Sequence, residues 1–508
     1  MKRFDHRLTR SESVMRQSLS GSPIAHRLLT GAFWSLLGGV ASRVFTVLSG
    51  VVVARIIGKE GFGEYGMVQS TIGMLGVLAG FGLGATATKF VADARHGDPA
   101  RAERVANLTL LVAVASGALL AATTFLSSHW LAASTLQRPE LSGLLQAASL
   151  LLFCSALNNV MLGTLAGFEA FRQVARINLW QGLAAPPSAI LLVLAFGVDG
   201  AVASLTVNAA LGTLLCAAAL RGHYRDHSMS AAYHPSLWSE WPVLWRFSLP
   251  TMLSGLMVAP VTWLANLFLV SLPGGYGELG LFNAANQWRA VVMLVPGLLA
   301  SVMLPILSAA HGAGQGEFDR AVSLNLKGTW LFCLPLTVAV MVLNRQLTAL
   351  FGKAYAGSGP VMVLLMISCF FMIVNNTVGA ALAGSGRMWA GFAMNCAWGV
   401  SLVAGAWLLV PRMGAFGLAL AYLLAYLLHT CWQMLYLELK LACSPVVSQW
   451  KLILFSLFVL AAGAKLALAP VSPFAGAALV LVSLIPVLWT VARGFQGGYA
   501  AAATGEIV

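Results

Sequence analysis

Three basic side chains interrupt stretches of sequence that are otherwise apolar. Arg43 lies near the middle of one stretch, Arg289 lies within another, and Lys327 lies close to the start of a third. Ionisable groups inside a bilayer are costly and therefore tend to be functional. The 17 acidic residues all fall in loops or at the ends of such stretches. Because a guanidinium without a carboxylate partner attracts anions and binds phosphate through paired hydrogen bonds, we expect these cations to hold a diphosphate. Lys327 has an alternative use, since its long side chain can reach the membrane surface.

Neutral amides form a second polar layer in the same stretches, which includes Asn266 and Asn283. The amides that lie near Trp180 or Trp288 are Asn178, Gln181, Asn286 and Gln287. Amide donors and acceptors next to aromatic faces suit the binding of sugars. Hydrogen bonds between helices are the alternative role for such groups. We predict that these four amides bind the substrate together with Arg43, Arg289 and Lys327.

Catalysis and metal binding have no recognisable motif in the sequence. There is no Gly-x-x-x-x-Gly-Lys-Ser/Thr segment and no legible nucleophilic triad. The 7 cysteines form neither a Cys-x-x-Cys pair nor a cluster with histidine at metal-ligand spacing. We therefore expect no enzyme activity, no cofactor, no bound metal and reduced cysteines that serve packing.

The composition places these residues in a membrane protein. Hydrophobic residues make up 59% of the 508 and charged residues 9%, with a mean hydropathy of +0.82, whereas a soluble domain is about 25% charged. We expect an all-α integral membrane protein with about 14 transmembrane helices. The expected spans are 28–54, 65–88, 105–126, 141–166, 177–197, 201–220, 247–271, 279–309, 321–343, 360–383, 388–410, 415–437, 452–469 and 474–492.

The charge pattern predicts the orientation. The net charge is +13, which in a membrane protein indicates cationic cytoplasmic loops rather than a nucleic-acid partner. With the N-terminus inside, the cytoplasmic segments hold about three times as many Lys and Arg residues as the outer ones. The polar, basic residues 1–27 contain no apolar core of a signal peptide. We expect a multi-pass protein with both termini in the cytoplasm.

The two halves of the chain repeat each other. Residues 61–67 resemble 275–281, Asn158-Asn159 match Asn375-Asn376, and 200–201 match 414–415, at a spacing of roughly 215 residues. An even number of spans between the copies makes the repeat parallel, with two six-helix lobes around a central cavity. The glycines of residues 61–67 and 275–281 suit a tight turn and close helix approach.

The repeat divides the chain into five parts. They are a cytoplasmic N-terminus (1–27), an N-lobe (28–220), a cytoplasmic linker (221–246), a C-lobe (247–437), and two additional C-terminal helices with a tail (438–508).

Several glycine-based segments resemble a known family. Residues 58–66 (GKEGFGEYG), 80–84 (GFGLG), 350–355 (LFGKAY) and 414–419 (GAFGLA) occur in the order and places found in the polysaccharide biosynthesis, or oligosaccharide flippase (Wzx-type), family. This family belongs to the multidrug/oligosaccharidyl-lipid/polysaccharide exporter superfamily. Its relatives include MurJ-type lipid II flippases, in which cavity arginines on the first and eighth spans matter, and MATE drug exporters. Arg43 and Arg289 lie on the corresponding spans.

The resemblance implies a function that composition alone does not show. It implies translocation of a polyprenyl-diphosphate-linked oligosaccharide across the bacterial inner membrane by alternating access, for O-antigen, capsule or exopolysaccharide synthesis. Candidate partners besides the bilayer are a polysaccharide polymerase and a chain-length regulator. The alternatives are a lipid II flippase or a multidrug exporter of the same superfamily and, in another class, a polytopic polymerase or ligase. The absence of acids inside the spans argues against cationic drugs.

Overall fold

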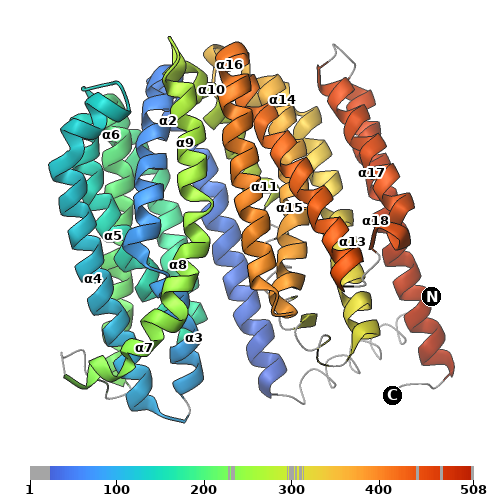
Figure 1. The fold of residues 1–508 in the computed structure, drawn as a ribbon, viewed down its shortest axis with the longest axis horizontal. Helices are drawn as coiled ribbons and strands as arrows, with labels where there is room; N and C mark the ends of the chain where they lie inside the picture. The colour runs from blue at the N-terminus through green and yellow to red at the C-terminus, as the bar shows by residue number, and fades with distance from the viewer. Residues whose placement is uncertain are drawn as a thin grey trace, which may run out of the picture.

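The computed structural model describes residues 23–504 except 96, 227–228, 230–234, 294–295, 297–302, 304–305, 308–309, 311, 313, 442–444 and 469–472. Side chains are described between residues 44 and 490, with further gaps at 254, 445–448 and 473. Within this part of the chain every regular element is helical (Figure 1). The prediction of an all-α membrane protein is confirmed at this level.

The longer helices are α2 (Pro23–Gly80), α3 (Leu83–Ala94), α4 (Pro99–Trp130), α5 (Leu141–Gly167), α6 (Phe171–Asp226), α9 (Ala259–Val270), α10 (Gly275–Gln287), α13 (Gln315–Val342), α15 (Ser358–Gly384), α16 (Met388–Leu441), α17 (Pro445–Leu468) and α18 (Pro473–Thr504). The shorter ones are η1 (Leu131–Thr135), η2 (Pro235–Glu240), α7 (Trp241–Val243), η3 (Leu244–Ser248), α8 (Leu249–Leu256), α11 (Arg289–Val292), α14 (Asn344–Ala349) and η4 (Lys353–Tyr355).

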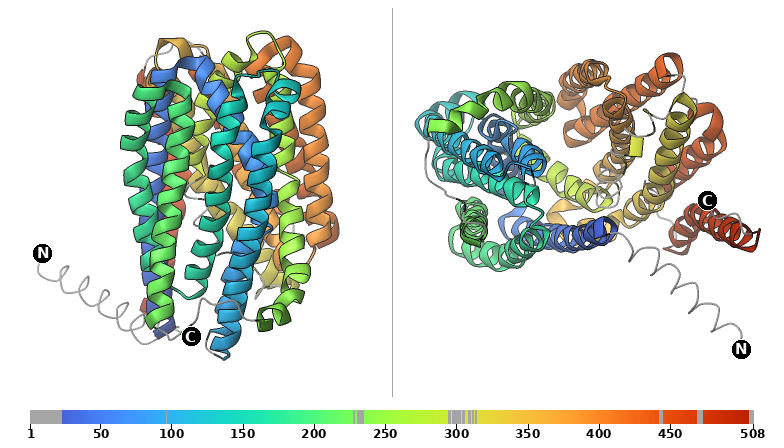
Figure 2. Two further views of the ribbon diagram at one scale, coloured as in Figure 1. Left: turned by 90° about the vertical axis from the view of Figure 1, so that its left-hand side faces the viewer. Right: turned by 90° about the horizontal axis from the view of Figure 1, so that it is seen from below.

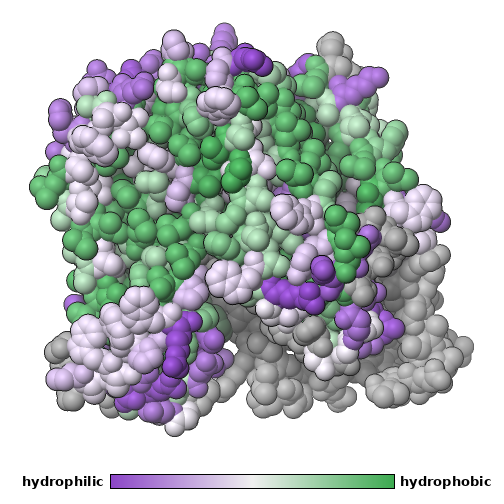
Figure 3. Space-filling view, viewed as in Figure 1, coloured by the Kyte–Doolittle hydropathy of each residue, from purple (hydrophilic) through white to green (hydrophobic). Residues whose placement is uncertain are grey.

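The outside of the bundle matches a bilayer. Among the described residues, 8 helical segments are long and apolar enough to cross a membrane, and the shorter apolar helices Ala259–Val270 and Phe474–Thr490 accompany them. Figure 3 shows one face with hydrophobic side chains over its middle and hydrophilic ones along its upper and lower edges. A bilayer would cover that middle band, since apolar surface is stable in hydrocarbon.

The three longest helices each consist of two arms joined at a glycine. Gly58 in α2, Gly197 in α6 and Gly414 in α16 have φ angles of 72°, 58° and 54°, a left-handed conformation that glycine adopts without strain. In α6 the Gln181 Nε2 lies 3.3 Å from the Asn208 carbonyl oxygen, whereas a straight helix would separate these residues by about 40 Å. The chain therefore reverses at these glycines, and the arms lie side by side (Figures 1 and 2).

Equivalent contacts occur inside the two halves of the chain. In the first half Cys216 Sγ donates to Asn158 Oδ1 over 3.2 Å. In the second half Thr430 Oγ1 donates to Asn375 Oδ1 over 2.9 Å. Both pairs join the helix before a two-arm helix to the second arm of that helix, α5 to α6 and α15 to α16. The repeated asparagines therefore have the same packing role in each half.

At the end of the bundle that holds Gly58 and Gly414, the second arm of α2 and helix α10 meet backbone to backbone. A Cβ on Gly63 would lie 1.8 Å from the Tyr276 carbonyl oxygen, and one on Gly280 would lie 1.8 Å from the Lys59 carbonyl oxygen. We call this the α2–α10 contact. Gly63 serves close approach here, while the turn before α10 has its left-handed residue at Gly274.

Polar bonds reinforce closure at the same end. The Tyr276 hydroxyl donates to the Leu136 carbonyl oxygen over 2.9 Å, and the Tyr355 hydroxyl donates to the Ala54 carbonyl oxygen over 2.9 Å. Arg138, in the turn between α4 and α5, stacks on the Tyr276 ring at 5.0 Å and pairs with Glu64 at 2.8 Å. Each of these contacts either joins the two halves of the chain or stabilises a residue that joins them.

At the opposite end of the bundle the helices extend beyond several of the predicted spans. Helix α6 continues to Asp226, helix α13 begins at Gln315, and turns η2, α7 and η3 fill much of the predicted linker 221–246. The turns that extend α6 and α13 are polar, and hydropathy detects only the length of helix that crosses hydrocarbon. Buried Glu240 fixes this segment to α4 by pairing with Arg101 at 3.2 Å and Arg104 at 3.4 Å.

Candidate functional site

Arg289 begins the short helix α11, directly after a break in the helix at Trp288. Its Nη1 donates to Asn286 Oδ1 over 2.9 Å, and its Nη2 lies 2.8 Å from the Met372 sulfur. The Tyr422 ring lies 5.8 Å from the guanidinium carbon, and Tyr426 lies on the same side of α16. Helices α10, α15 and α16 therefore position the cation within the second half of the chain.

Arg289 has no acidic partner among the described residues. Its neighbours are an amide, a thioether, a thiol and two phenols. Its Nε is buried and makes no hydrogen bond. A thioether is a weak acceptor, and a buried charge without a counter-ion is unfavourable. An anionic oxygen would be a stronger acceptor than Met372 and would also neutralise the charge.

A group of amides lies next to this cation, where α10 faces α2. Gln287 packs on Gly50 and Asn283 packs on Gly66, and a Cβ on either glycine would lie within 2.0 Å of an amide nitrogen. Asn283 Nδ2 and Gln287 Oε1 are buried without hydrogen-bond partners. They provide donors and acceptors at the boundary between the halves, which a hydroxylated ligand or water can use.

Helix α9 contributes two further polar contacts to α2. Asn266 Nδ2 donates to Ser70 Oγ over 3.1 Å, and Trp263 Nε1 donates to Thr71 Oγ1 over 3.0 Å. Asn266 and Asn283 are absent from the predicted site residues. The spacing between Asn283 and Gln287 is a signal that could have identified Asn283, because residues four apart share one helix face.

Among the described side chains, Asn178, Gln181 and Lys327 make no recorded contact with Arg289. Gln181 donates to the Asn208 carbonyl oxygen within α6, and Asn178 is half-buried one turn earlier. Lys327 is half-buried on α13, and no hydrogen bond or ion pair joins it to another described residue. Arg43 lies on the first arm of α2, but its side chain is outside the described part of the structure. The structure thus brings Asn286 and Arg289 together, with Gln287 adjacent.

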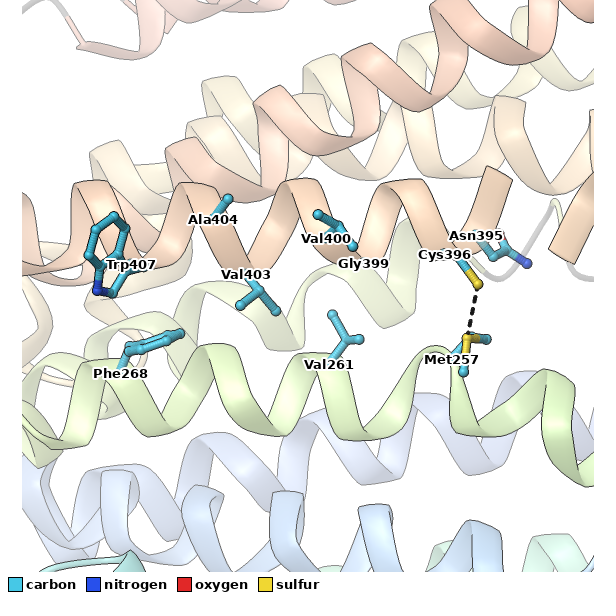
Figure 4. A pocket seen from close by; sticks show the side chains of 10 residues that line it. All are labelled: Met257, Val261, Phe268, Asn395, Cys396, Gly399, Val400, Val403, Ala404 and Trp407. Atoms are coloured by element: carbon cyan, nitrogen blue, oxygen red, sulfur yellow. Dashed lines mark hydrogen bonds between the residues drawn. The ribbon is translucent and has the colours of Figure 1, made fainter. Parts of the chain in front are cut away.

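An apolar cavity of about 560 Å³ lies between α9 and the first arm of α16 (Figure 4). It extends from Trp407 and Phe268 at one end to Asn395, Cys396 and Met257 at the other. Cys396 and Met257 contact each other through their sulfur atoms at 3.3 Å. No charged side chain lines this cavity, so it is separate from the environment of Arg289.

The long apolar helices define a multi-pass membrane protein, and solved structures of transporters share its fold. The lipid II flippase MurJ in an inward closed conformation superposes with a TM-score of 0.69 at 14% identity, over 91% of this chain and 99% of that one. A multidrug resistance MATE family transporter of the MOP superfamily in an inward-facing conformation gives 0.65 at 16% identity, over 80% and 98%. At these identities the likeness concerns the fold.

The family follows from sequence comparison. The model of the family described as "Polysaccharide biosynthesis protein" matches residues 28–311, and the chain belongs to this family. The chain is 25% identical over 439 residues to the EPS I polysaccharide export inner membrane protein EpsE of Ralstonia solanacearum, covering 83% of this chain and 97% of that protein. It is 24% identical over 362 residues to the succinoglycan biosynthesis transport protein ExoT of Rhizobium meliloti, covering 70% and 68%. The resemblance noted from the sequence is confirmed, as is a multi-pass inner-membrane transporter.

Proposed function

We propose that the protein is a flippase that moves a polyprenyl-diphosphate-linked oligosaccharide across the inner membrane for surface polysaccharide synthesis. The observation that carries the proposal is the Arg289 guanidinium, held inside the bundle by uncharged groups with Nε free. Such a site suits the diphosphate of a lipid-linked sugar, while the lipid tail stays in the bilayer. The names of the polysaccharide-export relatives support the same cargo.

The proposed architecture has 14 spans, two six-helix lobes around a central cavity, two further C-terminal helices and both termini in the cytoplasm. The reversals at Gly58, Gly197 and Gly414 support the span count, because each divides one long helix into two spans. The equivalent bonds of Asn158 and Asn375 support the repeat. On this orientation the α2–α10 contact closes the outer side, which suits loading of the cargo from the cytoplasm.

The related cargoes are less well matched. A multidrug exporter needs a buried carboxylate for its cation, and Arg289 would repel a cation. Lipid II also carries a diphosphate, so the chemistry of Arg289 fits it equally, and the names of the relatives favour an oligosaccharide of a surface polysaccharide. A polymerase and a chain-length regulator that consume the flipped product are the proposed partners.

The experiment measures polysaccharide export in cells that carry variants of the transporter, normalised to its membrane abundance. One charge-assisted hydrogen bond contributes about 1.5–3 kcal/mol, so Arg289→Ala should weaken substrate affinity roughly 10- to 150-fold. Arg289→Lys should restore part of the export, because lysine keeps the charge and loses the paired geometry. Arg43→Ala should also reduce export, and Lys327→Ala should have a milder effect.

Arg412→Ala is the matched control, because this arginine is exposed near the Gly414 turn and should leave export unchanged. Full export by the double variant Arg43→Ala, Arg289→Ala would overturn the anion mechanism. Suppose that cells without the transporter lose some other surface product, while the lipid-linked oligosaccharide still reaches the outer face of the membrane. The assigned cargo would then be wrong.

A further inference from the structure

The segment between α6 and α8 exposes three tryptophans close together. Trp238, Trp241 and Trp245 are 45%, 42% and 58% exposed. Their rings form a row, with centroids 5.6 Å apart in the first pair and 6.4 Å apart in the second. Indole rings are large and mostly apolar, so three of them together on a surface indicate contact with something other than water.

Helix η2 gives this segment three different faces. In a 3₁₀-helix the side chains of residues three apart lie one above the other. The faces hold a buried pair, an exposed hydroxyl pair and an exposed indole pair, namely Leu237 with Glu240, Ser236 with Ser239, and Trp238 with Trp241. The segment therefore presents one face to the protein, a second that is polar and a third that is aromatic.

The buried face is fixed to α4 at the point where that helix becomes apolar. Glu240 pairs with Arg101 at 3.2 Å and with Arg104 at 3.4 Å. Residues 105–130 of α4 contain no Asp, Glu, Lys or Arg, and this helix is apolar enough to cross a membrane. Because charges avoid hydrocarbon, Arg104 marks the edge of the bilayer. Glu240 and the rings beside it therefore lie at this edge.

A second attachment, to α3, places the segment at the same level. Lys89 Nζ lies 4.5 Å from the centre of the Phe247 ring, and Ser248 Oγ lies 2.7 Å from Thr86 Oγ1. Lys89 is the first charged residue after the uncharged stretch 65–88. The segment thus bridges two helices of the first half, at the border between their charged ends and their apolar lengths.

The bilayer is the partner that suits the aromatic face. Indole rings concentrate at the level of the lipid headgroups, because the ring is apolar and its N–H needs a polar partner. Figure 3 shows weakly polar surface at the position of α7, directly below the hydrophobic band, so the aromatic face continues the surface that the bilayer covers. Arg246 is exposed next to Trp245 and adds a cation that suits lipid phosphates.

We propose that Trp238, Trp241 and Trp245 anchor this segment in the headgroup region of the membrane, in the cytoplasmic leaflet on the proposed orientation. The predicted linker 221–246 then lies partly on the membrane surface rather than in the cytoplasm. Because both attachments are to helices of the first half, the anchor holds that half in the membrane. This surface binds lipid and does not depend on the cargo at Arg289.

The test compares the surroundings of single fluorescent labels on the full-length protein, with the native cysteines replaced. The protein is placed in nanodiscs of phosphatidylethanolamine and phosphatidylglycerol, and NBD is attached to Trp241→Cys on the aromatic face or to Ser239→Cys on the polar face. Leu119→Cys, at a position on α4 that is 68% exposed, is the reference for hydrocarbon. Iodide quenches labels in water, and a nitroxide near the top of the lipid acyl chains quenches labels at headgroup level.

The label at Trp241→Cys should be quenched several-fold less by iodide, and several-fold more by the lipid nitroxide, than the label at Ser239→Cys. Leu119→Cys should resist iodide. Equal quenching at the first two positions would overturn the inference, because the aromatic face would then meet the same surroundings as the polar face. If both labels faced water, the rings would be left for a protein partner.

A second measurement keeps all three rings in place. Wild-type protein in nanodiscs that contain phosphatidylglycerol with a photoreactive diazirine beside its headgroup should form crosslinks within residues 235–248. A variant with Trp238, Trp241 and Trp245 all changed to serine should lose most of these crosslinks and keep those on α4, which report correct insertion. Wild-type protein that crosslinks through α4 and not through this segment would contradict the anchor. Equal yields from the two proteins would do the same, since the rings would then make no difference.

Discussion

Closure at the α2–α10 contact depends on the absence of a side chain at Gly63. In Gly63→Ala the new methyl group would lie 1.8 Å from the Tyr276 carbonyl oxygen, whereas ordinary contacts begin at 3.4 Å. The two backbones must therefore separate by more than an ångström. Overpacking of this kind costs about 1–3 kcal/mol, which should lower the ratio of closed to open molecules by roughly 5- to 150-fold.

The assay is a distance measurement between spin labels on the two halves, with the native cysteines replaced. Ala133 and Lys353 are exposed residues close to the contact, one in each half. The wild type should give mainly the short distance of the closed state, and Gly63→Ala should populate a longer one. Gly73→Ala is the matched control, because this glycine lies on the same arm with nothing within 4 Å of an added Cβ.

The reasoning would be refuted if Gly63→Ala and Gly73→Ala gave ratios of closed to open molecules within twofold of each other. Thermal unfolding of both variants in detergent shows whether a changed ratio reflects opening or loss of the fold. Opening predicts two defined distances with little loss of stability, whereas misfolding predicts a broad distribution.

Three other substitutions test the same geometry. Tyr276→Phe removes one hydrogen bond between the halves, worth about 0.5–1.5 kcal/mol, and should raise the open fraction in the same distance assay. Gly197→Ala forces a residue with a side chain into a backbone conformation with φ of 58°, at a cost of about 1–3 kcal/mol, and should lower the melting temperature. Gly143→Ala is the control, because an added Cβ there meets nothing within 4 Å and should leave the melting temperature nearly unchanged. Glu278→Ala removes the acceptor 2.8 Å from the Ala415 N–H and should destabilise the protein by about 0.5–2 kcal/mol, measured by the same unfolding.

The sequence alone was sufficient for the features that depend on composition and on order along the chain. A helical membrane protein follows from the apolar stretches, and the importance of residues 61–67 and 275–281 follows from their repetition. The identity of the turning residue did not follow. A glycine adopts many backbone conformations, so the pattern does not tell that Gly58 reverses the chain while Gly63 makes a contact with the other half.

The surroundings of Arg289 were also beyond prediction from one sequence. Its exceptional position in an apolar stretch identified it, because burial of a charge is costly wherever it occurs. Its partners Met372 and Tyr422 lie on α15 and α16, far along the chain, and only the packing of three helices brings them together. Asn286 was easier to predict as a partner, since it precedes Arg289 by three residues and lies on the same side of the helix.

Among the described residues Arg289 has no counter-ion, and this would give the proposed transport cycle an electrical character. A unit charge that crosses the whole membrane potential gains or loses about 2.3 kcal/mol per 100 mV. On the proposed function, the field acts on the guanidinium and a bound diphosphate as one body, so their combined charge sets the work done in the loaded step of the cycle. The voltage dependence of that loaded step would therefore report a smaller valence than the lipid-linked sugar carries. The return of the empty site moves the arginine's charge back, so the complete cycle carries the full charge of the cargo.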